Sequence, residues 1–225
     1  MVYSKWSSKV KKIIISIISI ASIITVGITF SAAYSATKNY NQKTYQTGDI
    51  VFQTTKGKIA AVASSATLSK YTHVGMIVVK RGKPYVIEAN GPVRYVSLKR
   101  FIKRGVGSRI TIMRLKNLLT KKQKRKLVRQ ANKYLGKGYD SRFRWSDKRM
   151  YCSELVYKVY NRGLKISLNK PQKIGDFYSP LNPISIAYAK KAYGKKIPMD
   201  EKVVSPARIY RSDKLIKVFD NYPII

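Results

Sequence analysis

The chain contains 225 residues, which is enough for one large domain or two small ones. Hydrophobic residues make up 44% of it, so a buried core is expected rather than disorder, and the single cysteine excludes an internal disulfide framework. The formal net charge of +36 comes from 46 basic against 10 acidic residues. Such a charge either keeps the protein soluble or attracts polyanions, namely nucleic acid, anionic lipid or an anionic cell-wall polymer.

Residues 1–36 are typical of an export signal. Lysines between positions 5 and 12 precede an uncharged segment at residues 13–30, and small residues follow it. Cleavage after Ala33 or Ala36 would make residues 1–36 a signal peptide. Without cleavage, residues 13–30 would be an N-terminal hydrophobic helix at the lower length limit for a membrane anchor. Under both alternatives the rest of the chain is exported, to the extracellular space, the cell wall or the outer side of the membrane.

The first half of the folded part is predicted to consist mainly of strands. Residues 37–47 are polar and read as a linker, so the folded domain is expected over residues 48–225. The predicted strands are residues 50–52, 73–79, 85–89, 93–98 and 109–115. Turns at residues 81–84 and 90–92 are short enough for antiparallel hairpins. Short helical segments are predicted within residues 57–69 and 99–105.

The second half changes to a helical period. The predicted helices are residues 120–135 with Thr120 as cap, 153–162 closed by Gly163, and 184–193. Loops are predicted at residues 136–140 and 170–183, and a last strand with a Ser-Pro turn within residues 203–219. The basic face of the first helix is either solvated or docks a polyanion. Strands first and helices mainly afterwards favour the α+β class.

Cys152, the only cysteine, is the first candidate for chemistry. Apolar residues follow it at helical spacing, so we expect it in the first turn of a helix or just before it. Unpaired N–H groups and the positive end of the helix dipole favour a thiolate there. A thiol with a lowered pKa would be a nucleophile near neutral pH. The alternative is that Cys152 is one more small apolar residue of the core.

His73, the only histidine, opens a predicted strand, and Glu88 lies on the next one. Glu88 is flanked by apolar residues and is the only carboxylate between Asp49 and Asp140. With the turn centred on residues 82–83, the numbers of paired residues sum to about 165, which brings Glu88 within reach of His73. Glu88 would then orient the imidazole and stabilise its charged form. The alternative partner for Glu88 is one of the many lysines or arginines.

Other chemistries have little support in the sequence. One histidine, one cysteine and scattered acids offer no cluster of metal ligands, and we expect no metal or other cofactor. No glycine motif that cradles a phosphate is present. The charge and the 17 tyrosines favour nucleic-acid binding, but no motif supports it and the export signal argues against it.

Four stretches together point to a known family. They are GDIVFQ at residues 48–53, THVG at residues 72–75, VIEA at residues 86–89, and Tyr139-Asp140 followed by YCSELV at residues 151–156. In their order and spacing they resemble the permuted papain-like amidases (YiiX-type), relatives of the NlpC-type cell-wall peptidases, from residue 48 to about residue 183. In papain-like enzymes the cysteine helix usually precedes the sheet with the histidine. Here the sheet comes first, as the permutation implies.

The resemblance implies a circularly permuted papain-like fold, in which an antiparallel sheet carrying His73 and Glu88 packs on a helix with Cys152 at its N-terminus. It matches Cys152 to the nucleophile, His73 to the base and Glu88 to the third polar residue of the family. Tyr139 or Tyr151 would help to line the oxyanion site. The implied activity is that of a cysteine hydrolase, an amidase or peptidase that attacks an amide or ester carbonyl.

The high charge is not a family requirement and leaves the substrate open. An anionic wall polymer, a wall peptide or a lipid is the expected partner or substrate, and the membrane is a further one if residues 13–30 stay attached. Two other hypotheses remain. One is a catalytically inactive cationic module that binds an anionic surface, and the other is a lipid acyl hydrolase or transferase of the same fold.

Overall fold

The computed structural model describes residues 45–177 and 182–223. The predicted signal or anchor at residues 1–36 and most of the predicted linker lie outside these residues. Tyr45 and Thr47, from the end of that linker, are packed into the fold, since Tyr45 is buried and the Val79 N–H donates to Thr47 Oγ1 at 2.9 Å. Within the described ranges, no helix has the length and apolar character needed to cross a membrane.

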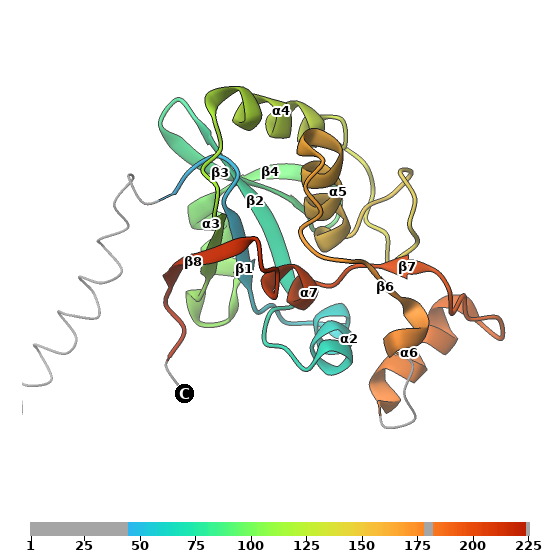
Figure 1. Ribbon diagram of the computed structural model, residues 1–225. Helices are drawn as coiled ribbons and strands as arrows, with labels where there is room; N and C mark the ends of the chain where they lie inside the picture. The colour runs from blue at the N-terminus through green and yellow to red at the C-terminus, as the bar shows by residue number, and fades with distance from the viewer. Residues whose placement is uncertain (1–44, 178–181, 224–225) are drawn as a thin grey trace, which may run out of the picture. The chain divides into compact units, whose positions relative to one another are not determined.

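A six-stranded antiparallel sheet is the framework of the fold (Figure 1). Its strands stand in the order β4-β3-β2-β1-β5-β8. Their bounds are β1 Ile50–Gln53, β2 His73–Lys80, β3 Lys83–Ala89, β4 Val93–Ser97, β5 Thr111–Leu115 and β8 Leu215–Asp220. Strands and helices are both present and the sheet is antiparallel, so the predicted α+β class is confirmed. The last strand pairs with β5, which brings the C-terminal segment back to the sheet.

The hairpin between β2 and β3 is tighter than the sequence suggested. Its turn is Arg81-Gly82, and both residues have positive φ angles of 48° and 74°. Positive φ at both central positions gives a two-residue turn the twist that matches its strands. The predicted turn over residues 81–84 is therefore too long, because β3 already begins at Lys83 and Pro84 pairs with Val79.

Helices lie on both faces of the sheet. Their bounds are α2 Lys58–Thr67, α3 Leu98–Arg104, α4 Lys121–Asn132, α5 Cys152–Leu164, α6 Pro183–Tyr193 and α7 Pro206–Tyr210. Short 3₁₀ turns (Val106–Ser108 and Ile174–Phe177) and a two-stranded ribbon of β6 (Gln172–Lys173) and β7 (Lys202–Val203) complete the described elements. The apolar side of α5 packs with Val74, Met76 and Ile87 of the central strands, and α3 contacts β3 and β4. Thr120 caps α4 as expected and forms a capping box with Gln123.

One predicted helix end and one predicted turn are wrong. The Cys152 helix does not end at Gly163 but runs to Leu164, and Lys165 takes the left-handed cap conformation with φ 60°. Gly163 instead faces α4, where an added Cβ would lie 3.4 Å from the Cβ of Gln130. The predicted Ser-Pro turn is in fact the start of α7, because the Ser205 side chain caps that helix and Pro206 occupies its first turn.

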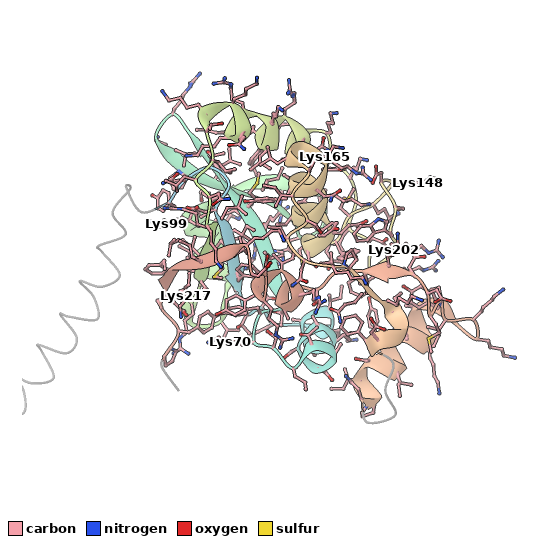
Figure 2. All side chains as sticks on the ribbon, in the orientation of Figure 1. Lys70, Lys99, Lys148, Lys165, Lys202 and Lys217 are labelled. Carbon is pink, nitrogen blue, oxygen red and sulfur yellow. The ribbon has the colours of Figure 1, made fainter. Side chains whose placement is uncertain are left out.

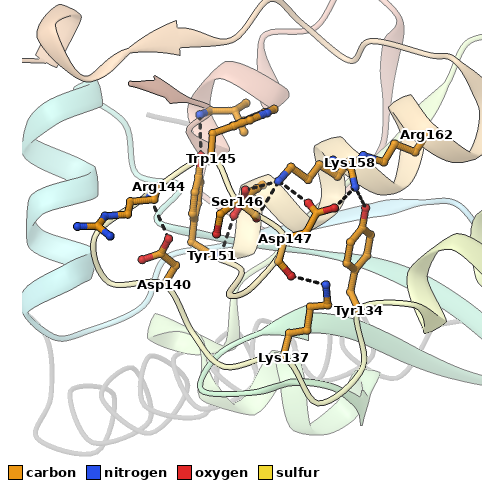
Figure 3. A network of polar contacts seen from close by, with 12 residues as sticks. Tyr134, Lys137, Asp140, Arg144, Trp145, Ser146, Asp147, Tyr151, Lys158 and Arg162 are labelled. Atoms are coloured by element: carbon orange, nitrogen blue, oxygen red, sulfur yellow. Dashed lines mark hydrogen bonds and ion pairs between the residues drawn. The ribbon is translucent and has the colours of Figure 1, made fainter. Parts of the chain in front are cut away.

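A polar network fastens the segment before α5 to that helix (Figure 3). Lys158, buried in α5, donates to Glu154 Oε1 at 2.6 Å and to Asp147 Oδ1 at 2.9 Å. Arg162, one turn further along, also pairs with Asp147. Since Asp147 lies only a few residues before Cys152, these contacts fix the chain as it enters α5.

Candidate active site

Cys152 is the first residue of α5 and is 5% exposed. Burial raises the pKa of the thiol. The hydrogen bond and charge of His73 and the backbone N–H groups of Val74 and Ser153 act the other way, and the net pKa lies below its ordinary value. The site therefore favours a thiolate, which is the state of a cysteine that acts as a nucleophile.

The His73 ring is the partner of that thiol. It is buried, stacks on Phe101 of α3 at a centroid distance of 5.5 Å, and has its Nε2 atom 2.7 Å from Glu88 Oε2. Because Nε2 is engaged by Glu88, Nδ1 is the ring nitrogen left for Cys152. Burial lowers the pKa of His73, but the hydrogen bonds and charges of Cys152 and Glu88 outweigh it and raise the pKa to about 9. The ring is thus an imidazolium at neutral pH, and its charge favours the thiolate form of Cys152.

The strand register explains why His73 and Glu88 meet. Met76 pairs with Ile87, so the register is displaced by about two residues from the predicted one, and Glu88 lies level with Gly75. His73 and Glu88 are therefore diagonal neighbours on one face of the hairpin, close enough for long side chains to touch. An added Cβ on Gly75 would lie 2.4 Å from Val86 Cγ1 and 3.5 Å from the Cβ of Glu88. Glycine here leaves this crowded part of the face to the carboxylate.

Glu88 has a second cationic partner, which is Arg104 at the C-terminal end of α3. An Arg104 guanidinium N–H donates to Glu88 Oε2, the same oxygen that contacts His73. Burial raises the pKa of Glu88, but His73 and Arg104 together hold it below its ordinary value. Both interpretations of Glu88 from the sequence thus apply, because it contacts the histidine and also forms an ion pair. No sequence signal distinguished Arg104 from the other basic residues.

The two tyrosines considered for the oxyanion site both line the cavity at Cys152. The Tyr151 hydroxyl accepts a hydrogen bond from the Val204 N–H at 3.2 Å. Burial raises the pKa of both phenols. After burial, the largest influence on the pKa is the charge of Cys152 for Tyr139 and the charge of Glu154 for Tyr151. Tyr139 is therefore the tyrosine more directly exposed to charge at Cys152.

Cys152 helps to line an apolar cavity of about 120 Å³. Its walls come mainly from α2, α6 and the segment after α5. The apolar residues that line it include Ile59, Val62, Ala63, Ala66, Phe143, Ile174, Phe177 and Ala189. The sequence contained the small apolar residues of α2 but gave no indication that α6 lies against them.

A second hollow of about 990 Å³ reaches His73. It adjoins the apolar cavity, because Ile59, Thr72 and Tyr139 line both. Besides His73, the described residues that line the hollow include four cations and no acid, the cations being Lys56, Lys58, Lys103 and Arg104. The Cys152–His73 pair thus lies between an apolar space and a basic one.

A cysteine at a helix N-terminus, paired with a histidine on an antiparallel sheet and backed by a carboxylate, is an arrangement found in cysteine hydrolases. The comparisons with known proteins agree with this class. The family model for the permuted papain-like amidases (YaeF/YiiX, C92 family) matches residues 44–219, and the chain belongs to this family. The family resemblance inferred from the four sequence stretches is confirmed.

Two relatives illustrate the similarity. The protein YiiX of Escherichia coli (strain K12) is 41% identical over 179 residues, which are 80% of this chain and 88% of that protein. A crystal structure of YiiX from Escherichia coli O157:H7, which is described as a metalloprotein, matches with a TM-score of 0.76 and 42% identity. That match covers 79% of this chain and 98% of the other.

The description of that relative raises the question of a metal in this chain. Within residues 45–177 and 182–223, His, Cys, Asp and Glu side chains do not gather in groups of three or more that could hold a metal ion. Cys152 and Glu88 both face His73, and Glu88 also faces Arg104, so these donors are committed to one another. The described residues therefore do not fit a metal centre.

Proposed function

We propose that this protein is a thiol hydrolase that cleaves an amide or ester bond of an apolar acyl group, with Cys152, His73 and Glu88 as the catalytic residues. The observation that carries the proposal is the apolar cavity that Cys152 helps to line. Ligand cavities take the chemistry of their lining, and an aliphatic chain fits this one better than a polar wall peptide. Membership of the papain-like amidase family supports the hydrolase class.

The reaction would proceed in two steps. The Cys152 thiolate attacks the carbonyl carbon, and the His73 imidazolium gives its proton to the leaving amine or alcohol as the thioester forms. A water molecule then attacks the thioester, giving one proton to His73 and releasing the acid and the thiolate. Glu88 holds the ring in place throughout and stabilises it whenever it is charged. An amine or alcohol in place of the water would make the reaction an acyl transfer.

The negative oxygen of each tetrahedral intermediate needs donors. The backbone N–H of Cys152, at the first position of α5, has no partner within its own helix. The Tyr139 hydroxyl is the second candidate, because its pKa responds to charge at Cys152. We assign the oxyanion role to this pair and leave Tyr151 as the residue that braces the segment around Val204.

The basic hollow suggests the other half of the substrate. Because it is lined by cations and adjoins the apolar cavity at Tyr139, it suits an anionic group attached near the acyl carbonyl. An amphiphile with an aliphatic chain and a phosphate or carboxylate would match both spaces. The +36 charge of the chain would thus contribute to substrate attraction.

The test is hydrolysis of p-nitrophenyl esters from acetyl to dodecanoyl, with N-acyl amino acid amides as a second series. Wild type should prefer the longer chains, and Cys152→Ala should be inactive. Ala63→Trp fills the cavity and should reduce turnover of long chains by about tenfold relative to short ones. The matched control is Ala61→Trp, since Ala61 is exposed on the same helix. Equal turnover of all chain lengths, or cleavage of wall peptides only, would refute the acyl class.

The remaining proposals concern location and partners. We assign the chain to the exported fraction on the basis of residues 1–36, and its partner to an anionic wall polymer or anionic lipid on the basis of its charge. Figure 2 labels exposed lysines on separate elements, among them Lys99 on α3, Lys165 after α5 and Lys217 on β8. This spread of charge also favours the second candidate function, a cationic module that binds an anionic surface without turnover. Salt-sensitive binding of Cys152→Ala to phosphatidylglycerol vesicles, together with no turnover by the wild type, would favour the module.

A further inference from the structure

Arg104 adds a fourth charge to the Cys152–His73–Glu88 chain. Its guanidinium and the His73 ring contact the same oxygen, Oε2 of Glu88. The Arg104 side chain is 28% exposed, whereas that of Glu88 is 0% exposed. The other carboxylate oxygen, Oε1, is buried and has no hydrogen-bond partner among the described residues. Both cations therefore contact the same atom, so a change in the charge or position of one alters the interaction of the other with Glu88.

The four groups alternate in sign. A Cys152 thiolate, a His73 imidazolium, a Glu88 carboxylate and an Arg104 guanidinium carry no net charge together. Without Arg104 the same ion pair would leave one net negative charge in a buried site, which is costly. A site of that kind reduces the cost by taking up a proton, at Cys152 or at Glu88.

The other ionisable groups around the four do not replace Arg104. They are Tyr139, Tyr151, Asp140, Arg94, Lys56, Lys58 and Lys103. The tyrosines stay neutral because burial raises their pKa, and Asp140 accepts hydrogen bonds from the N–H groups of Arg142 and Arg144. Arg94 lies level with Glu88 on β4 but is exposed, as are the three lysines. Gln53, level with His73 on β1, is uncharged.

We propose that Arg104 is a positioning residue that balances Glu88 and so allows the Cys152 thiolate and His73 imidazolium to coexist at neutral pH. This inference rests on the proposed function for the identity of the nucleophile. The competing explanation is an ion pair that only attaches α3 to the sheet. The two differ in one consequence, because a structural ion pair changes stability without moving the pH at which Cys152 ionises.

Removing a positive charge raises the proton affinity of nearby groups, so without Arg104 the thiol should hold its proton to a higher pH. An Arg104→Met substitution should raise the pH of thiol ionisation by about one unit, which is about a tenfold loss of thiolate on the acid side. Arg104→Lys keeps the charge, so its thiol should ionise at nearly the same pH as that of the wild type.

The experiment is the pH dependence of iodoacetamide alkylation, followed by intact mass. Cys152 is the only cysteine, so the adduct reports this residue alone. The variants are Arg104→Met, Arg104→Gln, Arg104→Lys and the control Arg94→Met, which removes an exposed charge level with Glu88. Circular dichroism confirms that each is folded, and Arg104→Gln serves if Arg104→Met does not fold.

The proposal is supported if the pH of thiol ionisation rises in Arg104→Met or Arg104→Gln. It should return to nearly the wild-type value in Arg104→Lys and change little in Arg94→Met. Profiles that superimpose on wild type, or a shift no larger than in Arg94→Met, overturn it. Alkylation needs no substrate, so these outcomes are independent of the hydrolase assay. A wild-type thiol that ionises at its ordinary pH would instead count against the proposed function.

Discussion

The charge state of His73 is the prediction that tests the site most directly. Its pKa is raised from 6.5 to about 9, which corresponds to about 3 kcal/mol of preference for the charged ring. At pH 7 a group with that pKa is protonated about a hundredfold over its neutral form, whereas an ordinary histidine is mostly neutral. The preference comes from Cys152 and Glu88, and it persists although burial alone would lower the pKa.

The perturbation is Cys152→Ser, which keeps a hydrogen-bonding group of similar size but removes the negative charge. Because Cys152 raises the pKa of His73 through both a hydrogen bond and a charge, we expect that pKa to fall by about 1 to 2 units. Cys152→Ala removes the hydrogen bond as well and should lower it further.

The assay is an imidazole NMR titration. His73 is the only histidine, so its ring signals need no assignment. Wild type should titrate near pH 9, with imidazolium signals throughout the neutral range. Two results would show that the thiol and the imidazole are not coupled as described. One is a wild-type ring that titrates at or below pH 6.5, and the other is a His73 pKa that stays at the wild-type value in both Cys152 variants.

Three further predictions follow from the same contacts. Gly75→Ala should lower the free energy of unfolding in urea by about 1–3 kcal/mol, because its Cβ would lie 2.4 Å from a valine methyl group, whereas Gly138→Ala, with only ordinary contacts, should be nearly neutral. Lys158→Met leaves Glu154 buried without its cation and should cost about 3–5 kcal/mol, and the added change Glu154→Leu should recover much of it; additive losses in this double-mutant cycle would mean that the two groups are not coupled. Glu88→Gln should lower the pKa of His73. The alkaline limit of ester hydrolysis, expected near pH 9 in wild type, should then move to lower pH. An unchanged limit would show that Glu88 does not stabilise the charged form of His73.

Several parts of the fold were accessible from short stretches of sequence. Two runs of strand-forming residues joined by a short turn at residues 81–84 predicted the β2–β3 hairpin, and the hairpin brought His73 and Glu88 together even though the assumed register was two residues off. The spacing of apolar residues after Cys152 predicted a helix with the thiol at its start, and α5 begins at that residue. These features depend on contacts between residues close in the chain, whose geometry is set by strand pairing and helix periodicity.

Other parts depended on contacts that no local pattern encodes. In the sequence, nothing distinguishes Arg104 from the other Lys and Arg residues, which number 46 in all. Its contact with Glu88 depends on how α3 packs against the sheet. The apolar cavity exists because α2 and α6, far apart in sequence, lie together, as the hydrogen bond from Ser65 to Asn182 illustrates. Gly163 was predicted to end the helix because glycine commonly follows a helix end. In the structure it lies within the helix and allows a close contact with α4.

The sequence by itself indicated a candidate nucleophile, a candidate base and the family, because residue types in short stretches, in their order along the chain, carry that information. Only the tertiary structure decided what surrounds them, namely an apolar space on one side, a basic space on the other and an arginine behind the carboxylate. The physical reason is that burial and charge at a point depend on every chain segment packed there. Those segments are chosen by the global arrangement of the fold, not by their neighbours in sequence.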